Sequence, residues 1–397
     1  MRSCVLTMFA IVLLATPCPA DARTLQPGER LAISEDFILS GDDVLEINGT
    51  AEKPCRIDGN GNGFKTAGKW TGRIKVTHCE IRGLGSAAKP AFDITATGEG
   101  DKIAIEHCAF HASGAIHVAN TEKSATVFRH NTIQEDSVVA ISKDVGSSAH
   151  AFVARGNSRE RKLFQGNVIP RGKIVFEAPH WLIGGDSDAD SNLLIGLRIG
   201  IDARGEGTVV RGNYCHLLMP ITAEYPYWSQ ISVFTTGREV VGEHNVIRDG
   251  EWIVRFVEGE FRYNVISDII DHDLMQNGSI GRIHHNLFLA GTSKSRQGSM
   301  SACIAVVYPP KEPGAGIEIF NNVFDGGDRL DVPGIEVAAK GFVKSVRSNV
   351  FFNFAHKEKY YKLPQAMIRP IWNEEAGGDE KPARRSEERR VGKECRL

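Results

Sequence analysis

The stretch that decides the fold is a four-residue phrase, HNVI at 244–247, followed by YNVI at 263–266 and HNLF at 285–288. Related phrases are HNTI at 130–133, GNVI at 166–169, NNVF at 321–324 and SNVF at 348–351. Asn264 follows Asn245 by 19 residues and Asn286 follows Asn264 by 22, which suits one coil of three short strands. A repeat of this length predicts a solenoid.

The invariant Asn suggests how the coils hold together. Asn tolerates the left-handed backbone of a tight turn, and amides about 4.8 Å apart can hydrogen-bond from coil to coil. Longer spacings, such as the 36 residues from Asn286 to Asn322, mark loops or further coils. We therefore expect an all-β, single-stranded parallel β-helix with an Asn turn ladder and long loops on one side.

Two earlier segments have the same local sequence pattern, with Cys in place of Asn. They are VTHCEI at 76–81 and IEHCAF at 105–110. Cys79 and Cys108 are expected to stack in adjacent coils, either as a reduced row or as a disulfide. The sequence leaves both outcomes open.

Composition and the chain ends indicate one exported domain. Residues 1–22 have the pattern of a secretory signal, with Arg2, an apolar run and Ala20-Asp21-Ala22 before the expected cleavage at Arg23. The segment 385–397 resembles a translated sequencing-library adapter, so we expect the β-helix domain to span 23–384. The formal charge of −2 argues against a nucleic-acid partner, and no other segment predicts a membrane span. We expect a secreted or periplasmic protein.

Alignment of the coils on Asn separates an inner from an outer column. The residues three before Asn are mostly apolar and are expected to point inward. The residues two before Asn include Arg211, Glu243, Arg262 and His284, which are expected to form an outward stripe. This stripe is either a solvated face whose opposite charges compensate each other or a floor for an anionic sugar chain.

Two predicted loops add possible sugar contacts. Tyr225, Tyr227 and Trp228 lie in AEYPYWS at 223–229, and these rings either stack on sugars or cap the core. Lys294 and Arg296 lie in the Gly/Ser-rich TSKSRQGSMS at 292–301. Together with the segment 267–275, these loops are expected to rise on one side of the solenoid.

Acidic clusters suggest either proton transfer or Ca²⁺ binding. Asp271, His272 and Asp273 form the densest cluster, which can hold Ca²⁺, tune an imidazole or cap a turn. Asp249 and Asp268 each lie four residues after their Asn, so they are expected to be neighbours and a metal or acid pair.

A third acidic segment is DSDADSN at 186–192, where Asp186, Asp188 and Asp190 alternate like the start of a calcium loop. Ser191 and Leu197 at its sixth and twelfth positions exclude a complete EF-hand. A looser Ca²⁺ site and a simple polar turn both stay open.

The Asn repeats, GTAEKP at 49–54 and the export signal resemble the right-handed parallel β-helix superfamily, over roughly residues 25–355. That superfamily includes pectate and alginate lyases, chondroitinase B, polygalacturonases, epimerases and phage tailspikes. The resemblance implies the fold more strongly than an activity. RIK at 73–75 lacks the companion motifs of the polygalacturonases. The chain also has no clean match to the pectate lyase signature or to the Lys/Arg pair of the alginate lyase and chondroitinase B group, so no catalytic residue is carried over.

The leading hypothesis is a polysaccharide lyase that cleaves a uronate-containing chain by β-elimination. Arg262 and Arg211 would neutralise the carboxylate, with Ca²⁺ as the candidate cofactor; His272 or Lys294 would be the base and His284 the acid. One alternative is a glycoside hydrolase with paired carboxylates, either Asp249 with Asp268 or Asp271 with Asp273. The other is a non-catalytic carbohydrate-binding or surface β-helix protein.

Overall fold

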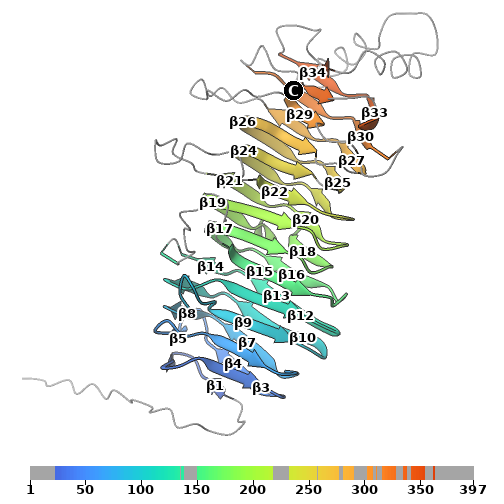
Figure 1. Cartoon of the computed structure of the whole chain (residues 1–397). Helices are drawn as coiled ribbons and strands as arrows, with labels where there is room; N and C mark the ends of the chain where they lie inside the picture. Colours follow the sequence, from blue (N-terminus) through green and yellow to red (C-terminus); the bar gives the residue numbers. More distant parts are fainter. Residues whose placement is uncertain are drawn as a thin grey trace, which may run out of the picture.

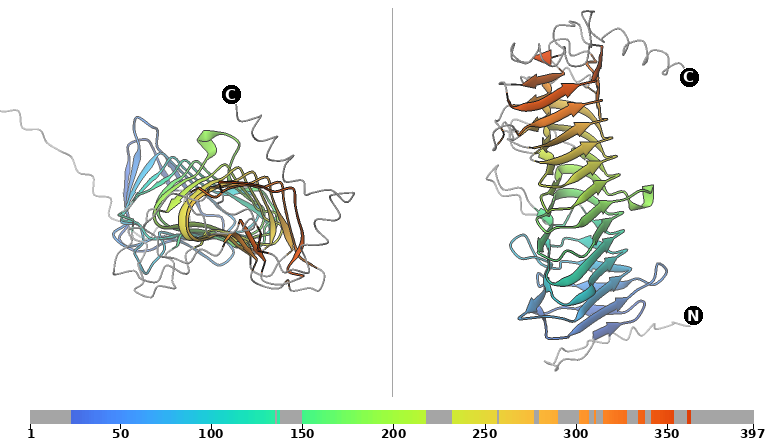
Figure 2. Two further views of the ribbon diagram at one scale, coloured as in Figure 1. Left: turned by 90° about the horizontal axis from the view of Figure 1, so that it is seen from above. Right: turned by 90° about the vertical axis from the view of Figure 1, so that its right-hand side faces the viewer.

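The computed structural model describes residues 23–134, 136–137, 150–217, 232–256, 258–276, 280–289, 302–306, 310, 315–327, 334–337, 341–353 and 361–362. These residues form stacked parallel strands that rise along one axis, from β1 at one end to β34 near the other (Figure 1). Viewed along that axis, successive coils overlie one another (Figure 2, left). The prediction of an all-β, solenoid-like chain of parallel strands is confirmed.

The described strands belong to a 13-stranded and a 22-stranded sheet. The first sheet, called row one, contains β1 (Arg23–Leu25), β4 (Val44–Asn48), β7 (Arg73–Thr77), β10 (Glu99–Glu106), β13 (Lys123–Arg129), β16 (Lys162–Gln165), β18 (Trp181–Gly184), β20 (Val209–Arg211), β23 (Val241–Glu243), β25 (Gly259–Arg262), β27 (Gly281–His284), β30 (Ile317–Phe320) and β33 (Val343–Arg347).

The second sheet contains two rows. Row two contains β2 (Arg30–Ala32), β5 (Cys55–Asp58), β8 (Cys79–Arg82), β11 (Ala109–His111), β14 (Thr132–Ile133), β17 (Val168–Phe176), β19 (Leu193–Ala203), β21 (Tyr214–Leu217), β24 (Val246–Phe256), β26 (Val265–Gln276), β28 (Leu287–Leu289), β31 (Val323–Asp325) and β34 (Val350–Phe352). Row three contains β3 (Phe37–Ser40), β6 (Phe64–Ala67), β9 (Phe92–Ala96), β12 (Ile116–Asn120), β15 (His150–Gly156), β22 (Ser232–Thr236), β29 (Ala302–Val306), β32 (Ile335–Val337) and β35 (Tyr361–Lys362). The long strands β17, β19, β24 and β26 pair in both rows and join them.

Among the described residues the helical content is one 3₁₀ turn, η1 (Asp188–Asp190), which projects from the stack and is drawn in green in Figure 2, right. No helix in this part of the chain is long and apolar enough to cross a membrane.

A buried row of asparagines links the coils at the turn between rows one and two. The asparagine row consists of Asn131, Asn167, Asn192, Asn213, Asn245, Asn264, Asn286, Asn322 and Asn349, each 4% exposed or less. Asn245 donates from its backbone N–H and from Nδ2 to Asn264 Oδ1, both at 2.9 Å. Its Nδ2 also donates to the Val210 carbonyl at 3.0 Å. The side-chain contact repeats from Asn131 to Asn349.

The left-handed residue at most of these turns is the one before Asn, which corrects the sequence prediction. His130, His244 and Tyr263 have φ between 55° and 56°, whereas the Asn that follows each has no positive φ. The Asn side chain turns inward to hydrogen-bond the neighbouring coils, so its contribution is the amide and not the backbone. Asn192 is a further member, after Ser191 with φ −66°, and it fills the long gap between Asn167 and Asn213.

Cysteines continue this row toward the N-terminus. Cys55 pairs in register with Cys79, and the alignment of β8 with β11 places Cys79 beside Cys108. The Cys108 N–H donates to Asn131 Oδ1 at 2.9 Å, the same contact that the N–H groups of the row make from Asn131 to Asn322. All three thiols are free and buried. The structure therefore shows the reduced row and not the disulfide.

The predicted inner column packs the core. The residues three before the Asn, including Phe128, Phe164 and Phe261, are buried, except Ala189 of the acidic loop, which precedes Asn192 and is exposed. The Phe288, Phe324 and Phe351 rings stack along the axis at 4.8 Å centroid spacing. The outer column is less exposed than predicted, because Glu243 is 2% and His284 6% exposed.

We predict that Asn245→Ala destabilises the protein by about 2–4 kcal/mol. The substitution leaves the buried Asn213 N–H without its acceptor, and an unpartnered buried group of this kind costs about 1–3 kcal/mol. It also removes one donor each from Asn264 Oδ1 and from the Val210 carbonyl. Urea unfolding measures the change, with the exposed Asn157→Ala as control. Equal stability of the two variants would refute a stabilising role for the row.

We also predict that residues 23–384 contain five thiols that react only after unfolding. Cys55, Cys79, Cys108, Cys215 and Cys303 are free and buried, and burial raises the pKa of Cys108 and of Cys215 to about 12. Thiolate is the reactive form, so a thiol reagent should modify the native protein very slowly and reach five equivalents in guanidinium. Fewer equivalents in guanidinium would indicate a disulfide.

Candidate functional site

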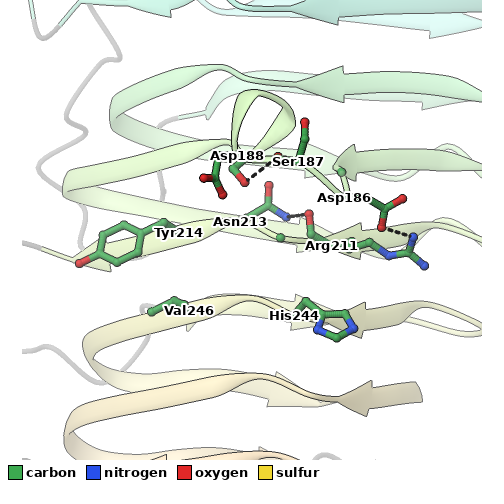
Figure 3. A pocket seen from close by; sticks show the side chains of 11 residues that line it. Asp186, Ser187, Asp188, Arg211, Asn213, Tyr214, His244 and Val246 are labelled. Carbon is green, nitrogen blue, oxygen red and sulfur yellow. Dashed lines mark hydrogen bonds and ion pairs between the residues drawn. The ribbon is translucent and has the colours of Figure 1, made fainter.

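A surface pocket of about 560 Å³ lies beside the asparagine row. Its lining comes from the acidic loop that follows β18, from the turn between β20 and β21, and from the turn before β24. Figure 3 shows the acidic loop above the turn at Asn213, with Tyr214 and His244 at the edges. The lining residues are Gly185, Asp186, Ser187, Asp188, Ser191, Arg211, Gly212, Asn213, Tyr214, His244 and Val246.

Two glycines allow the acidic loop to fold over the turns. Gly166 and Gly212 occupy the left-handed position before Asn, with φ of 64° and 66°. A Cβ at Gly166 would lie 2.5 Å from the Ala189 carbonyl oxygen, and one at Gly212 would lie 2.4 Å from the Gly185 carbonyl oxygen. The ring side chains found at other turns therefore cannot occupy these two positions, and the loop takes their place.

Arg211 connects the pocket to a network of charged residues. Its Nη1 donates to Asp186 Oδ1 at 2.7 Å and its Nε to Glu243 Oε1 at 2.6 Å. Glu243 also accepts from Arg262 Nε at 2.7 Å, so one buried carboxylate lies between two guanidinium groups. Arg262 Nη1 also lies 3.2 Å from Glu260 Oε1, which adds a second carboxylate to the network. The opposite charges of the outer column thus compensate each other, while each arginine keeps 32% of its side chain exposed.

The network sets the ionisation of its members. Burial acts to raise the pKa of Glu243, and the hydrogen bonds from Arg262 and Arg211 outweigh it, so this pKa is lowered. Burial lowers the pKa of His284, although its Nε2 lies 2.7 Å from Glu260 Oε1. The other His284 ring nitrogen lies 2.7 Å from His285 Nδ1. Both nitrogens are therefore engaged, and the buried ring is badly placed to protonate a substrate.

An exposed row of rings starts at the pocket. His244 lines the pocket and stacks on Tyr263, with ring centroids 5.2 Å apart and 9° between the planes. Tyr263 is 45% exposed and lies 5.1 Å from His285. We call His244, Tyr263 and His285 the ring row. A similar stack of His78, His107 and His130, at 4.6 and 4.8 Å, lies in the N-terminal coils and includes none of the residues that line the pocket.

The structure brings some predicted site residues together. Asp186, Asp188 and Arg211 line the pocket, and Glu243 and Arg262 connect to it through ion pairs. Asp190 lies in the same loop and accepts from Ser187 Oγ at 2.7 Å. Tyr225, Tyr227, Trp228, Lys294 and Arg296 lie outside the described residues. The same holds for the side chains of Asp249, Asp268, Asp271, His272 and Asp273.

The backbone nevertheless places the last five residues. Arg248 pairs with Ser267 and Gly250 with Ile269, so Asp249 and Asp268 occupy facing positions in β24 and β26. Residues 271–273 lie inside β26, which corrects the prediction of a loop there. The segment 267–275 forms the corner where β26 passes from row two to row three. The strand continues through this corner because its backbone still pairs with both neighbouring strands, as His272 does with Trp252 and Ala302.

The described residues do not contain a ready cation site. No group of three or more His, Cys, Asp or Glu side chains in the described part of the chain is arranged to hold a metal. In the acidic loop, Asp186 pairs with Arg211 and Asp190 with Ser187, so these two carboxylates turn to different partners. The Ca²⁺ prediction remains a prediction.

Sequence reasoning missed His244 and Tyr214. Both flank an Asn of the repeat, His244 one residue before Asn245 and Tyr214 one residue after Asn213. For His244 the signal was present in the quoted phrases, where the first letter is often His or Tyr. It was overlooked because the left-handed position was assigned to Asn, whereas His244 itself adopts it. Tyr214 has no such signal, since it stands after its Asn, in the phrase GNYC at 212–215.

Comparison with known proteins adds no assignment. No sequence profile of a known protein family matches the chain, and no curated protein matches it. The chemistry must therefore be inferred from the pocket and its surroundings.

We predict that Glu243→Gln lowers the stability by about 1–3 kcal/mol at pH 7, because it leaves Arg211 and Arg262 without their shared buried partner. Since the folded-state pKa of Glu243 is lowered, this stabilisation is present above its unfolded pKa of about 4.3 and is lost as the pH falls through the folded value. The difference in unfolding free energy between Glu243→Gln and wild type should therefore become smaller below about pH 4. Urea unfolding of both proteins at several pH values measures this difference.

Glu99→Gln is the control for this experiment, because Glu99 is 81% exposed and lies 3.8 Å from Lys123. A difference between wild type and Glu243→Gln that is equal at pH 7 and at pH 3 would contradict the ionic explanation.

Proposed function

We propose that this chain is an exported right-handed parallel β-helix protein that binds a uronate-containing polysaccharide and cleaves it by β-elimination at the pocket. The observation that carries the proposal is the position of His244, which lines the pocket and also begins the ring row. A polymer lying on the rings would pass directly into a pocket that contains Arg211 and Tyr214.

The ring row suits a sugar chain. Aromatic rings offer a flat apolar face, and Tyr263 and His244 are both exposed. Arg262 lies 5.9 Å from the Tyr263 ring centroid and can reach an acidic substituent on the same sugar. Small-molecule and sugar sites combine such apolar surface with a few polar groups, which here are Arg211, Asp186 and Asp188.

β-Elimination needs three functions at one place. The uronate carboxylate must be neutralised, the C5 proton must be removed, and the leaving O4 must be protonated. As the C5–H bond breaks, its electron pair forms the C4=C5 double bond, and the C4–O4 bond breaks with its pair on oxygen. We assign carboxylate binding to Arg211, proton removal to His244 and protonation of O4 to Tyr214. His284 is replaced in the acid role because its ring is buried.

One observation favours a second candidate, a binding protein without catalysis. Arg211 and Arg262 share Glu243, so their charges are already compensated within the protein. A surface of this kind can hold an acidic polymer through its rings and its exposed guanidinium edges without activating it.

A panel of uronate and neutral polysaccharides tests the proposal with residues 23–384. Unsaturated-uronate absorbance and reducing ends are followed together, with Ca²⁺ and with EDTA. A rise in both signals supports the lyase. Reducing ends alone would overturn it in favour of a hydrolase. No rise in either signal, together with retention of the protein on a polysaccharide gel, would overturn it in favour of the binding protein. Loss of activity in EDTA would support the Ca²⁺ prediction.

We predict that His244→Asn lowers the elimination rate about 100-fold or more, because general acid–base groups typically contribute that much. Asn tolerates the left-handed backbone, so the fold should be kept. Tyr263→Asn should mainly raise KM, because it removes a sugar contact that lies outside the pocket lining.

His78→Asn is the control for both variants, since His78 has the same backbone conformation in a coil distant from the pocket. If His244→Asn and His78→Asn had the same activity, His244 would not be the base.

A further inference from the structure

A second group of charged side chains lies on row three, away from the pocket. The register places His150 of β15 beside Lys173 of β17, and Lys173 beside Gly200 of β19, which has no side chain. His117 of β12 and Arg155 of β15 lie close enough to His150 to affect its ionisation. Neighbouring parallel strands are about 4.8 Å apart, so Lys173 and His150 are direct neighbours.

The nearby carboxylates are occupied by arginines. Asp202 of β19 accepts from Arg204 Nε at 2.7 Å and from its Nη2 at 2.5 Å. Glu177 accepts from Arg155 Nε at 3.3 Å. Within the described residues, no carboxylate lies within 4 Å of Lys173 Nζ, so its charge has no ion-pair partner there.

Lys173 is half-buried, and its surroundings are unfavourable to its charge. Burial lowers its pKa, Asp202 partly opposes this, and Arg204 and Arg255 lower the pKa further by repulsion. Its Nζ is not among the buried unpartnered side-chain atoms of the described residues, so the ammonium group reaches solvent and is open to an anion from outside. The other titratable groups around His150 are Asp202 and His117, and Asp93 acts on His117.

We propose that Lys173, with His150 beside it, forms an anion-binding site on row three that takes a carboxylate or sulfate group of an acidic polysaccharide. Lysine supplies a point charge with three donors, which suits either group. The site is separate from the pocket, because Lys173 lies in the part of β17 that pairs in row three, whereas the pocket lies at the turn between rows one and two. Binding at Lys173 does not require cleavage.

The test is affinity electrophoresis of residues 23–384 in gels containing polygalacturonate or dextran sulfate, which present carboxylates and sulfates. Lys173→Met should weaken binding to at least one polymer about tenfold, the loss expected for one charged hydrogen bond. Lys173→Arg should retain most of the binding. Lys123→Met is the matched control, because Lys123 is a 67% exposed lysine in row one. Wild-type binding of Lys173→Met to both polymers would overturn the proposal.

Two further measurements complete the test. If Lys173→Met proves unstable, His150→Gln replaces it in the test. His150 is exposed, so His150→Gln should keep the fold and weaken polymer binding. Wild-type polymer binding by His150→Gln would count against the site. If sodium sulfate competes with the polymer for the protein, the site also takes free anions. If sulfate does not compete, the site takes anionic groups of the polymer only. Both outcomes support the anion site. His244→Asn should still bind through Lys173, so failure of the pocket mechanism and failure of this site are distinguishable.

Discussion

From Asn131 to Asn349, a buried asparagine amide links each coil of the described structure to the next. Asn245 donates twice to Asn264 and once to Val210, and the same arrangement recurs from Asn131 to Asn349. A buried turn has backbone N–H and carbonyl groups that water cannot reach, and these must find partners inside the protein. The asparagine side chain supplies both a donor and an acceptor at that point. The turn can then be two residues long, and the strands on either side remain in register.

The surface chemistry follows from this turn. Because Asn faces inward, the residue before it adopts the left-handed conformation and projects outward. Where that residue is His or Tyr, the coil spacing stacks the rings, as in His244 and Tyr263. Where it is Gly, as at Gly166 and Gly212, the acidic loop packs over the turn. The pocket lies where these two arrangements meet, so one structural rule creates both the ring row and the wall beside it.

The sequence predicted an all-β chain of stacked parallel strands because the Asn phrase recurs along the chain. The inner apolar column, the continuation of the row by Cys79 and Cys108, and the parallel strands all follow from the spacing of the Asn phrases. The site was harder to predict, since it depends on contacts between coils. That Arg211 and Arg262 share Glu243 needs the register of three strands. The continuation of β26 through 271–273 also depends on its partners, because a strand that turns a corner has no sequence mark distinct from a loop. Asn192 was missed because its phrase lies inside the acidic segment.

The central claim is that an acidic sugar chain lies on the ring row and enters the pocket beside Arg211. A crystal structure of residues 23–384 grown with a short oligouronide tests it most directly. The account predicts one sugar stacked on Tyr263 and His244, with the carboxylate of the next sugar against Arg211. An oligouronide bound to another face at saturation, with the ring row and the pocket empty of sugar, would contradict it.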